Sequence, residues 1–213
     1  MIYIYKLLKV FILFFIAFPA SGQGPYDDLL KASQSGDVRT VRDLVSRGMS
    51  PDSTDPGGNS LLILAAREGK LEVVRELLSL KARPQARNAY GETALMLASL
   101  KGHLPIVRLL IERGAEVNQP GWSALHYCAT EDRVDVCKYL LQKGANIDAL
   151  SLNGTTPLMM AVRGGNIETA RLLLWEVADA KIKNDAGATA LQWALKSGHT
   201  DLAALLRQAG ATE

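Results

Sequence analysis

Three histidines and two cysteines are the residues of this chain with the widest range of chemistry. His103, His126 and His199 could serve as metal ligands or as general acids and bases, because imidazole changes its charge near neutral pH. No Gly-rich phosphate loop, nucleophile elbow or paired-carboxylate arrangement occurs in the sequence. The sequence therefore offers an enzyme no set of catalytic residues, and we predict a non-catalytic protein without a cofactor.

A short phrase recurs along the chain, each time after a glycine. The glycines are Gly58, Gly91, Gly121, Gly154 and Gly187, and successive members are 33, 30, 33 and 33 residues apart. The phrases that follow them are NSLLILAA, ETALMLAS, WSALHYCA, TTPLMMAV and ATALQWAL, and a second set reads VVRELL, IVRLLI, VCKYLL, TARLLL and LAALLR. Self-similarity at a period of this size is typical of repeat architectures.

The copy from Gly91 to Asn118 predicts two short antiparallel helices. Thr93 can cap the first helix, and Gly102 can end it in a left-handed conformation. The second helix carries Pro105 in its first turn, where a missing N–H costs nothing, and it closes at Gly114. Neither helix can bury its apolar stripe alone, so each unit needs neighbours in a stack.

These phrases resemble the ankyrin-repeat pattern, G-x-T-P-L-H-x-A-A-x-x-G-H-x-x-V-V-x-L-L-L-x-x-G-A. The resemblance runs from about Leu29 to Ala211. It implies an all-α solenoid of about six helix-turn-helix repeats with short β-hairpin-like fingers, and a divergent first repeat that acts as a cap. The expected repeats are residues 26–54, 55–87, 88–118, 119–150, 151–183 and 184–213.

The resemblance also assigns the histidines to structural positions. His126 falls on the histidine of T-P-L-H, where the imidazole of family members ties neighbouring turns together by hydrogen bonds. His103 and His199 fall on the histidine of G-H, at helix starts. Because a metal site needs three or four ligands at fixed geometry, side chains at different positions of different repeats favour no metal site.

The finger before Trp122 is three residues shorter than its neighbours, as the 30-residue spacing shows. A shorter finger leaves a gap in the row of finger tips. A loop deletion that the fold merely tolerates explains the gap equally well, because surface loops accept such changes at low cost.

Two repeats depart from the family at the end of their second helix. Lys81 and Val177 stand where other repeats have a glycine and where a positive φ is wanted. A β-branched residue fits that conformation poorly, so Val177 predicts either local strain or a different turn, with Trp175 covering the altered end.

The N-terminal residues 1–22 have the composition of a cleaved, bacterial-type secretory signal. Lys6 and Lys9 precede the apolar run from Val10 to Phe18, and small residues follow it. We expect residues 23–213 to form the ankyrin-repeat domain of an exported protein, in the periplasm or secreted. An uncleaved membrane anchor is the alternative, although the apolar run is short for a span. Without the signal the chain has 22 basic and 22 acidic residues, which argues against a nucleic-acid partner.

Cys128 and Cys137 take apolar positions of the repeat pattern, one on each helix of the fourth repeat. Two buried thiols are ordinary packing. An exported chain instead meets an oxidising compartment, where an even number of cysteines can pair. A disulfide requires Cα atoms within about 7 Å, which the sequence leaves open.

The resemblance places a concave binding surface on the fingers and the exposed side of the first helices. Tyr90, Leu100, Trp122 and Leu152 form its apolar centre, and charged residues surround them, which is the layout of a binding hot spot. The alternative is that these are scattered apolar residues of the kind that monomers tolerate. The predicted partner-binding residues are Tyr90, Glu92, Leu100, Lys101, Trp122, Glu131, Leu152, Asn153 and Arg163.

We therefore predict a monomeric protein–protein interaction module whose partner the sequence does not identify. A structural or protective accessory of an exported enzyme or envelope component, or a secreted effector acting on a host protein, would use the same surface. Alanine at Tyr90 or Trp122 should weaken partner binding and leave thermal unfolding nearly unchanged, if both side chains are exposed.

Overall fold

The computed structural model describes residues 24–212, and within them it contains twelve helices arranged in six pairs. The predicted signal peptide falls on residues 1–22, outside this described part. The helices are α1 (Pro25–Ser35), α2 (Val38–Ser46), α3 (Leu61–Arg67), α4 (Leu71–Ser79), α5 (Ala94–Lys101), α6 (Leu104–Glu112), α7 (Ala124–Thr130), α8 (Val134–Gln142), α9 (Pro157–Arg163), α10 (Ile167–Trp175), α11 (Ala190–Lys196) and α12 (Thr200–Gln208).

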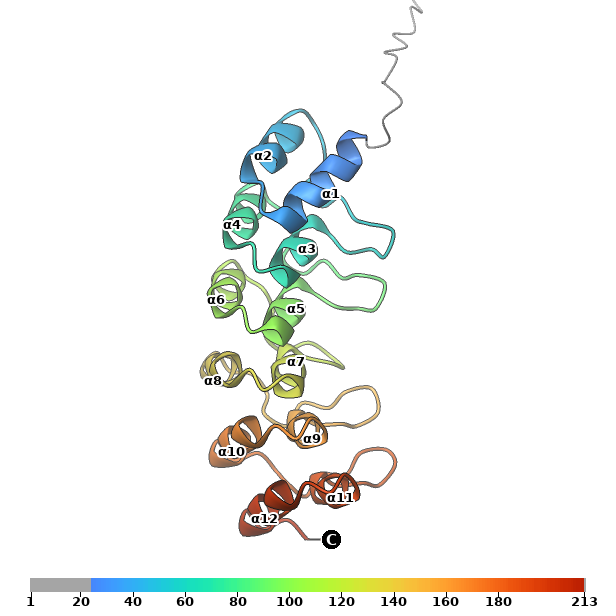
Figure 1. Cartoon of the computed structure of the whole chain (residues 1–213), viewed down its shortest axis with the longest axis vertical. Coiled ribbons are helices and arrows are strands. Elements are labelled where there is room, and N and C mark those ends of the chain that lie inside the picture. The colour runs from blue at the N-terminus through green and yellow to red at the C-terminus, as the bar shows by residue number, and fades with distance from the viewer. Residues whose placement is uncertain (1–23, 213) are drawn as a thin grey trace, which may run out of the picture.

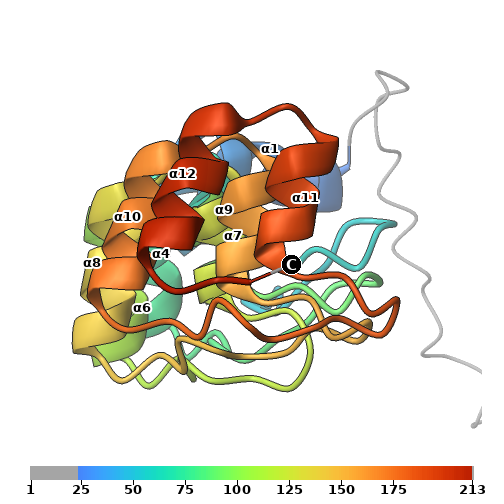
Figure 2. The same cartoon turned by 90° about the horizontal axis from the view of Figure 1, so that it is seen from below.

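The helices stand in two parallel rows that run the length of the molecule (Figure 1). The odd-numbered helices form one row and the even-numbered helices the other, and each helix contacts its partner in the pair and its neighbours in the row. The fingers project from the side of the odd-numbered row, as the view along the stack shows (Figure 2). This architecture confirms the predicted all-α ankyrin-type solenoid of six repeats.

A side-chain cap starts α5 at Thr93, as the sequence predicts, and equivalent caps start α9 and α11. The Oγ1 atom of Thr93 accepts a hydrogen bond from the N–H of Met96 at 3.3 Å. In the same way, Thr156 and Thr189 each accept, at 3.2 Å, from the N–H of the residue three positions later. Such a cap satisfies one of the free N–H groups of the first turn. Gly102 ends α5 in a left-handed conformation, at a φ of 78°.

One leucine of each odd-numbered helix anchors the core at the same repeat position. These leucines expose at most 1% of their surface. Burying such a side chain stabilises the fold by about 1.5–3 kcal/mol. These leucines all belong to one hydrophobic cluster, so the core is continuous along the stack. The residues are Leu29, Leu62, Leu95, Leu125, Leu158 and Leu191.

The fingers are tight turns that we number by their repeats: finger 2 (residues 55–59), finger 3 (88–92), finger 4 (119–122), finger 5 (151–155) and finger 6 (184–188). In fingers 2, 3, 5 and 6 the first N–H donates to the carbonyl of the fifth residue, at 2.9–3.0 Å. Finger 4 is the short one beside α7 (Figure 1) and has no such bond. Extended pairing in residues 24–212 is limited to one bridge, between Thr54 and Ser60.

Val177 keeps the same turn as its glycine counterparts and adopts a φ of 68°. The N–H of Ala178 donates to the carbonyl of Leu173 at 2.9 Å, as Ala115 does to Leu110. The strain alternative is therefore the one observed. The expected cover by Trp175 is wrong, because this side chain is 84% exposed.

No helix in the described residues has the length and apolar character needed to cross a membrane.

Candidate functional site

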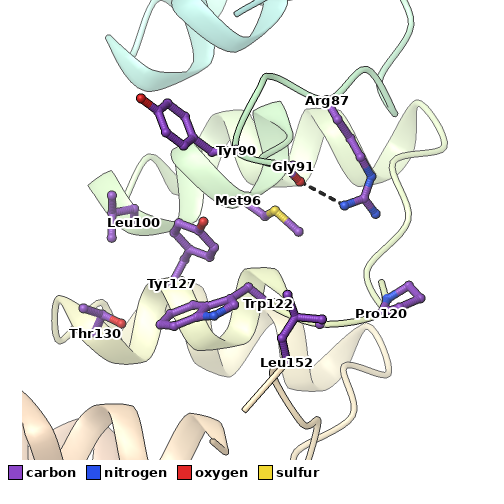
Figure 3. A pocket seen from close by; sticks show the side chains of 11 residues that line it. Arg87, Tyr90, Gly91, Met96, Leu100, Pro120, Trp122, Tyr127, Thr130 and Leu152 are labelled. Atoms are coloured by element: carbon purple, nitrogen blue, oxygen red, sulfur yellow. Dashed lines mark hydrogen bonds between the residues drawn. The ribbon is translucent and has the colours of Figure 1, made fainter. Parts of the chain in front are cut away.

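A hollow of about 510 Å³ opens on the finger side of the molecule, at the third, fourth and fifth repeats. We call it the apolar hollow. Figure 3 shows its lining, which comes from fingers 3, 4 and 5, from Arg87 just before finger 3, and from α5 and α7. The lining residues are Arg87, Tyr90, Gly91, Met96, Leu100, Pro120, Gly121, Trp122, Tyr127, Thr130 and Leu152.

The four apolar residues predicted at the centre of the binding surface all line this hollow. Tyr90 is 83% exposed and Leu152 is 90% exposed, so both side chains are available to a partner. Leu100 and Trp122 are partly buried and pack against the core. Trp122 is therefore not the free anchor that the sequence suggested, and it forms part of the floor instead.

The floor of the hollow contains the aromatic rings of Trp122 and Tyr127. The ring of Trp122 lies 5.5 Å from the ring of His126 and meets the ring of Tyr127 edge-on at 5.6 Å. The Tyr127 hydroxyl donates to Glu92 at 2.9 Å. Burial, followed by the carboxylate of Glu92, raises the pKa of Tyr127 above its usual range, so the hydroxyl stays a donor at neutral pH.

Glu92 belongs to the internal hydrogen-bond network rather than to the rim. Besides the Tyr127 hydroxyl, its carboxylate accepts a hydrogen bond from Nδ2 of Asn88 at 2.7 Å. The side chain is partly buried and does not line the apolar hollow. Glu92 thus positions Tyr127, and its contact with a partner stays a prediction.

Arg87 forms one wall of the hollow in a fixed conformation. Its Nη1 atom donates to the Gly91 carbonyl at 2.9 Å (Figure 3), and its Nη2 atom donates to Oε1 of Gln119 at 2.6 Å. Gln119 is 8% exposed and also donates to Gln85 at 3.2 Å. Side chains therefore tie the short finger 4 to finger 3.

Besides Glu92, four further predicted residues lie outside the apolar hollow. Lys101 and Glu131 are exposed near the ends of α5 and α7, and Glu131 lies 3.9 Å from Arg133. Asn153 and Arg163 line a second hollow of about 390 Å³. Its other lining residues are Trp193, Lys196 and Ser197.

Tyr127, Met96 and Arg87 were not singled out from the sequence. A signal existed for Tyr127, because it holds the same repeat position as Leu64, Leu97, Met160 and Trp193. The aliphatic members of that set are buried, whereas Tyr127 and Trp193 are partly exposed and each lines a hollow. Arg87 and Met96 gave no such signal.

His126 ties two repeats together, as the resemblance implies. Its Nδ1 atom accepts from the backbone N–H of Ser123 at 3.2 Å, so Nε2 carries the proton and donates to the Thr155 carbonyl at 2.9 Å. Burial lowers the pKa of His126 below its ordinary value, which keeps the ring neutral. In residues 24–212 no group of three or more His, Cys, Asp or Glu side chains could hold a metal ion.

A disulfide joins Cys128 on α7 to Cys137 on α8, and the two Cα atoms are 5.6 Å apart. Both residues are fully buried. Of the two alternatives open for the cysteines, the structure contains the bond. It links α7, the helix that carries Tyr127, to its partner α8 in the even-numbered row.

The stacked helix pairs and the row of fingers define a repeat solenoid that presents one continuous face. The sequence matches the family described as Ankyrin repeats (3 copies) over residues 29–121, 84–151 and 146–212. The chain therefore belongs to the ankyrin-repeat family.

The chain is also similar to parts of much longer proteins. Palmitoyltransferase Hip14 of Drosophila melanogaster is 38% identical over 87 residues, which are 38% of this chain and 14% of that protein. Protein glp-1 of Caenorhabditis elegans is 32% identical over 111 residues, 47% of this chain and 9% of its own length. Ankyrin repeat and KH domain-containing protein mask-1 of the same species is 35% identical over 100 residues, which are 46% of this chain and 4% of that protein. The chain thus spans only a small part of each relative.

Proposed function

We propose that this protein is a non-catalytic interaction module that binds a partner protein through the apolar hollow. One observation carries the proposal. Two almost fully exposed side chains, Tyr90 and Leu152, face a hollow whose floor is the partly buried Trp122. Exposed apolar residues gathered at a concavity are typical of an interaction site, whereas scattered ones need no explanation.

The energetics favour a protein surface as the ligand. Burial of one large apolar side chain contributes about 1.5–3 kcal/mol, so a partner that covers Tyr90 and Leu152 gains a central anchor. A ring contact between Trp122 and Tyr127, and the hydrogen bond from Tyr127 to Glu92, fix the conformations of both side chains before a partner binds. A preformed floor lowers the entropic cost of association.

The ionisable side chains that line the hollow support binding rather than catalysis. They are Arg87, Tyr90 and Tyr127. A general acid–base reaction needs groups whose pKa lies near the working pH, and the pKa of Tyr127 is moved away from it. The activity in the name Palmitoyltransferase Hip14 is that protein's own, and the small matched share gives no reason to transfer it.

Export of a monomeric protein to the periplasm, or beyond it, is the second part of the proposal. The disulfide between Cys128 and Cys137 supports it, because such bonds persist in oxidising compartments. Fractionation of the producing cells into cytoplasm, periplasm and medium tests this part. Recovery of the protein only in the cytoplasm, with both thiols reduced, would contradict it.

The binding proposal is tested by quantitative capture from the periplasmic fraction and the medium. A Tyr90→Ala, Leu152→Ala double variant should capture at least tenfold less of the specific partner than the unchanged protein, with the same thermal unfolding. Trp175→Ala is the matched control, because Trp175 is 84% exposed but belongs to α10, in the even-numbered row. Equal capture by all three proteins would remove the hollow as the binding site.

A further inference from the structure

The fingers are linked to one another by a backbone ladder. The N–H of the second finger residue donates to the carbonyl of the third residue of the preceding finger. Ala89 of finger 3 donates to Gly57 of finger 2 at 3.1 Å, and Asp185 of finger 6 donates to Asn153 of finger 5 at 3.1 Å. An equivalent backbone hydrogen bond therefore joins finger 2 to finger 3 and finger 5 to finger 6.

The ladder is interrupted at finger 4. The carbonyl of Tyr90 holds the position of Gly57 and Asn153, and the N–H of Leu152 holds the position of Ala89 and Asp185. Within residues 24–212 neither group has a hydrogen-bond partner in the protein. The reason is the shorter finger 4: it has four residues where the others have five, and neither Gln119 nor Pro120, which has no N–H, forms a backbone bond to either group.

One unpaired acceptor and one unpaired donor thus flank the apolar hollow on opposite sides. In a complete finger 4, adjacent residues would supply the N–H for Tyr90 and the carbonyl for Leu152. A polypeptide presents these two groups in that order along its backbone, and exposed edges of this kind are completed by added strands in other proteins. Arg87 is held by Gly91 and Gln119, which makes a phosphate group a less suitable occupant.

We infer that the gap at finger 4 is a docking slot for an extended segment of the partner protein, which takes the place of the missing finger tip. This inference rests on the proposed function. One N–H of the segment donates to the Tyr90 carbonyl, and the carbonyl of the next residue accepts from the Leu152 N–H. An apolar side chain of the segment covers Trp122 and lies beside Leu152. The Leu152 side chain is already close to finger 4, because its Cδ2 would lie 3.6 Å from a Cβ added at Gly121.

The experiment uses a library of random linear peptides displayed on phage and selected on the full chain. Selected peptides are synthesised, and their Kd values are measured for three proteins. The first is the unchanged chain. The second is a gap-filled variant in which residues 119–120 are replaced by the sequence of residues 182–186, which restores the common finger length. The third is a control with three residues inserted between Asp185 and Ala186, at the tip of finger 6.

We expect the selected peptides to bind the gap-filled variant at least tenfold more weakly and the control within about twofold. N-methylation of a single backbone nitrogen in the peptide should weaken binding to the unchanged chain about tenfold, because it removes one ladder bond. This second measurement needs no change in the protein, so it still tests the docking slot if the gap-filled variant unfolds.

Peptides that bind the gap-filled variant as tightly as the unchanged chain would overturn the docking slot. If those peptides still lose binding with Tyr90→Ala, Leu152→Ala, the proposed function stands and only the slot falls. If neither change affects any peptide, both proposals fall. Self-association of the unchanged chain in sedimentation, abolished in the gap-filled variant, would assign the slot to a second copy and overturn a heterologous partner.

Discussion

Tyr90 and Trp122 line the same hollow but contribute differently to the fold. Tyr90 precedes the glycine of its finger and points away from the repeat, so it is 83% exposed. Trp122 follows its glycine, at the point where the chain enters α7, and its ring packs on His126 and Tyr127. Position relative to the glycine therefore decides the burial of each aromatic ring.

Alanine substitutions should separate these two roles. Trp122→Ala removes ring contacts and part of the core cover, so we expect the free energy of unfolding to fall by roughly 1–3 kcal/mol. Tyr90→Ala should change it by less than about 0.5 kcal/mol, as is usual for an exposed side chain. Urea unfolding measures both values. Equal losses would mean that Tyr90 also packs in the fold.

His126 makes stability depend on pH in the mildly acidic range. Its pKa in the folded protein is lowered by burial, so the unfolded state binds the proton more readily. The stabilising contribution of the neutral ring is complete above the unfolded pKa of about 6.5, and it is lost as the pH falls below that value towards the folded pKa. We expect the melting temperature to fall between pH 7.5 and pH 5.

The control for this pH dependence is His126→Gln. Gln192 occupies the same position in the sixth repeat and accepts from the Thr189 N–H at 3.0 Å through its side-chain oxygen, so an amide fits the site. The variant should be less stable at pH 7.5 by about 1 kcal/mol, for the lost bond to Thr155, and should lack most of the pH 5–7.5 slope. An unchanged slope would assign the effect to other groups.

At the scale of the element, the turn after α10 is strained by a β-branched residue. Val177 has a φ of 68°, where glycine occurs in the equivalent turns at Gly48, Gly114, Gly144 and Gly210. A left-handed conformation costs such a residue about 1–2 kcal/mol. Val177 is 81% exposed, so its side chain offers little burial in return.

Val177→Gly should therefore stabilise the protein by about 0.5–1 kcal/mol, after the larger entropy of the unfolded glycine is subtracted. Thermal unfolding should show a rise of roughly 2–3 °C. Gly144→Val is the reverse control, because Gly144 has a φ of 80° and open space around an added Cβ. A gain from Gly144→Val would refute the conformational explanation.

The disulfide fixes the α7–α8 pair at the centre of the stack. Cys128 and Cys137 are nine residues apart, and closing a loop of that length restricts the unfolded chain by about 2–3 kcal/mol in the entropic model. The Cys128→Ala, Cys137→Ala double variant should lose about that much stability in urea unfolding. Reductant should destabilise the unchanged chain and leave the double variant unaffected.

The sequence predicts the helices well because each of their determinants is local. The cap at Thr93, the stop at Gly102 and the apolar stripes lie within one repeat, and the family pattern supplies the stacking. The hollow depends on contacts between repeats, such as the bond from Tyr127 to Glu92 across 35 positions. The exposed positions of Tyr90 and Leu152 follow from the repeat pattern, whereas the partial burial of Glu92 and Trp122 depends on neighbouring side chains that the pattern does not specify.

At the scale of the whole molecule, residues 24–212 form a one-dimensional array in which the main contacts of each helix pair are with the neighbouring pairs. The apolar hollow draws its lining from residues 87–152, and the second hollow needs Trp193 and Lys196 of the sixth repeat. Stability and binding can therefore be separated by removing an end of the array.

A chain that ends at residue 183 lacks α11 and α12 and exposes the faces of α9 and α10 that they cover. We expect it to unfold at lower temperature, with a loss of at least roughly 2 kcal/mol, because an interface between repeats is removed. Below its melting temperature it should bind peptides that require Tyr90 and Leu152 within about twofold of the full chain, measured by titration calorimetry. Loss of that binding in a folded truncated chain would place part of the recognition site in the second hollow, at Trp193 and Lys196, and would extend the partner's footprint over four repeats.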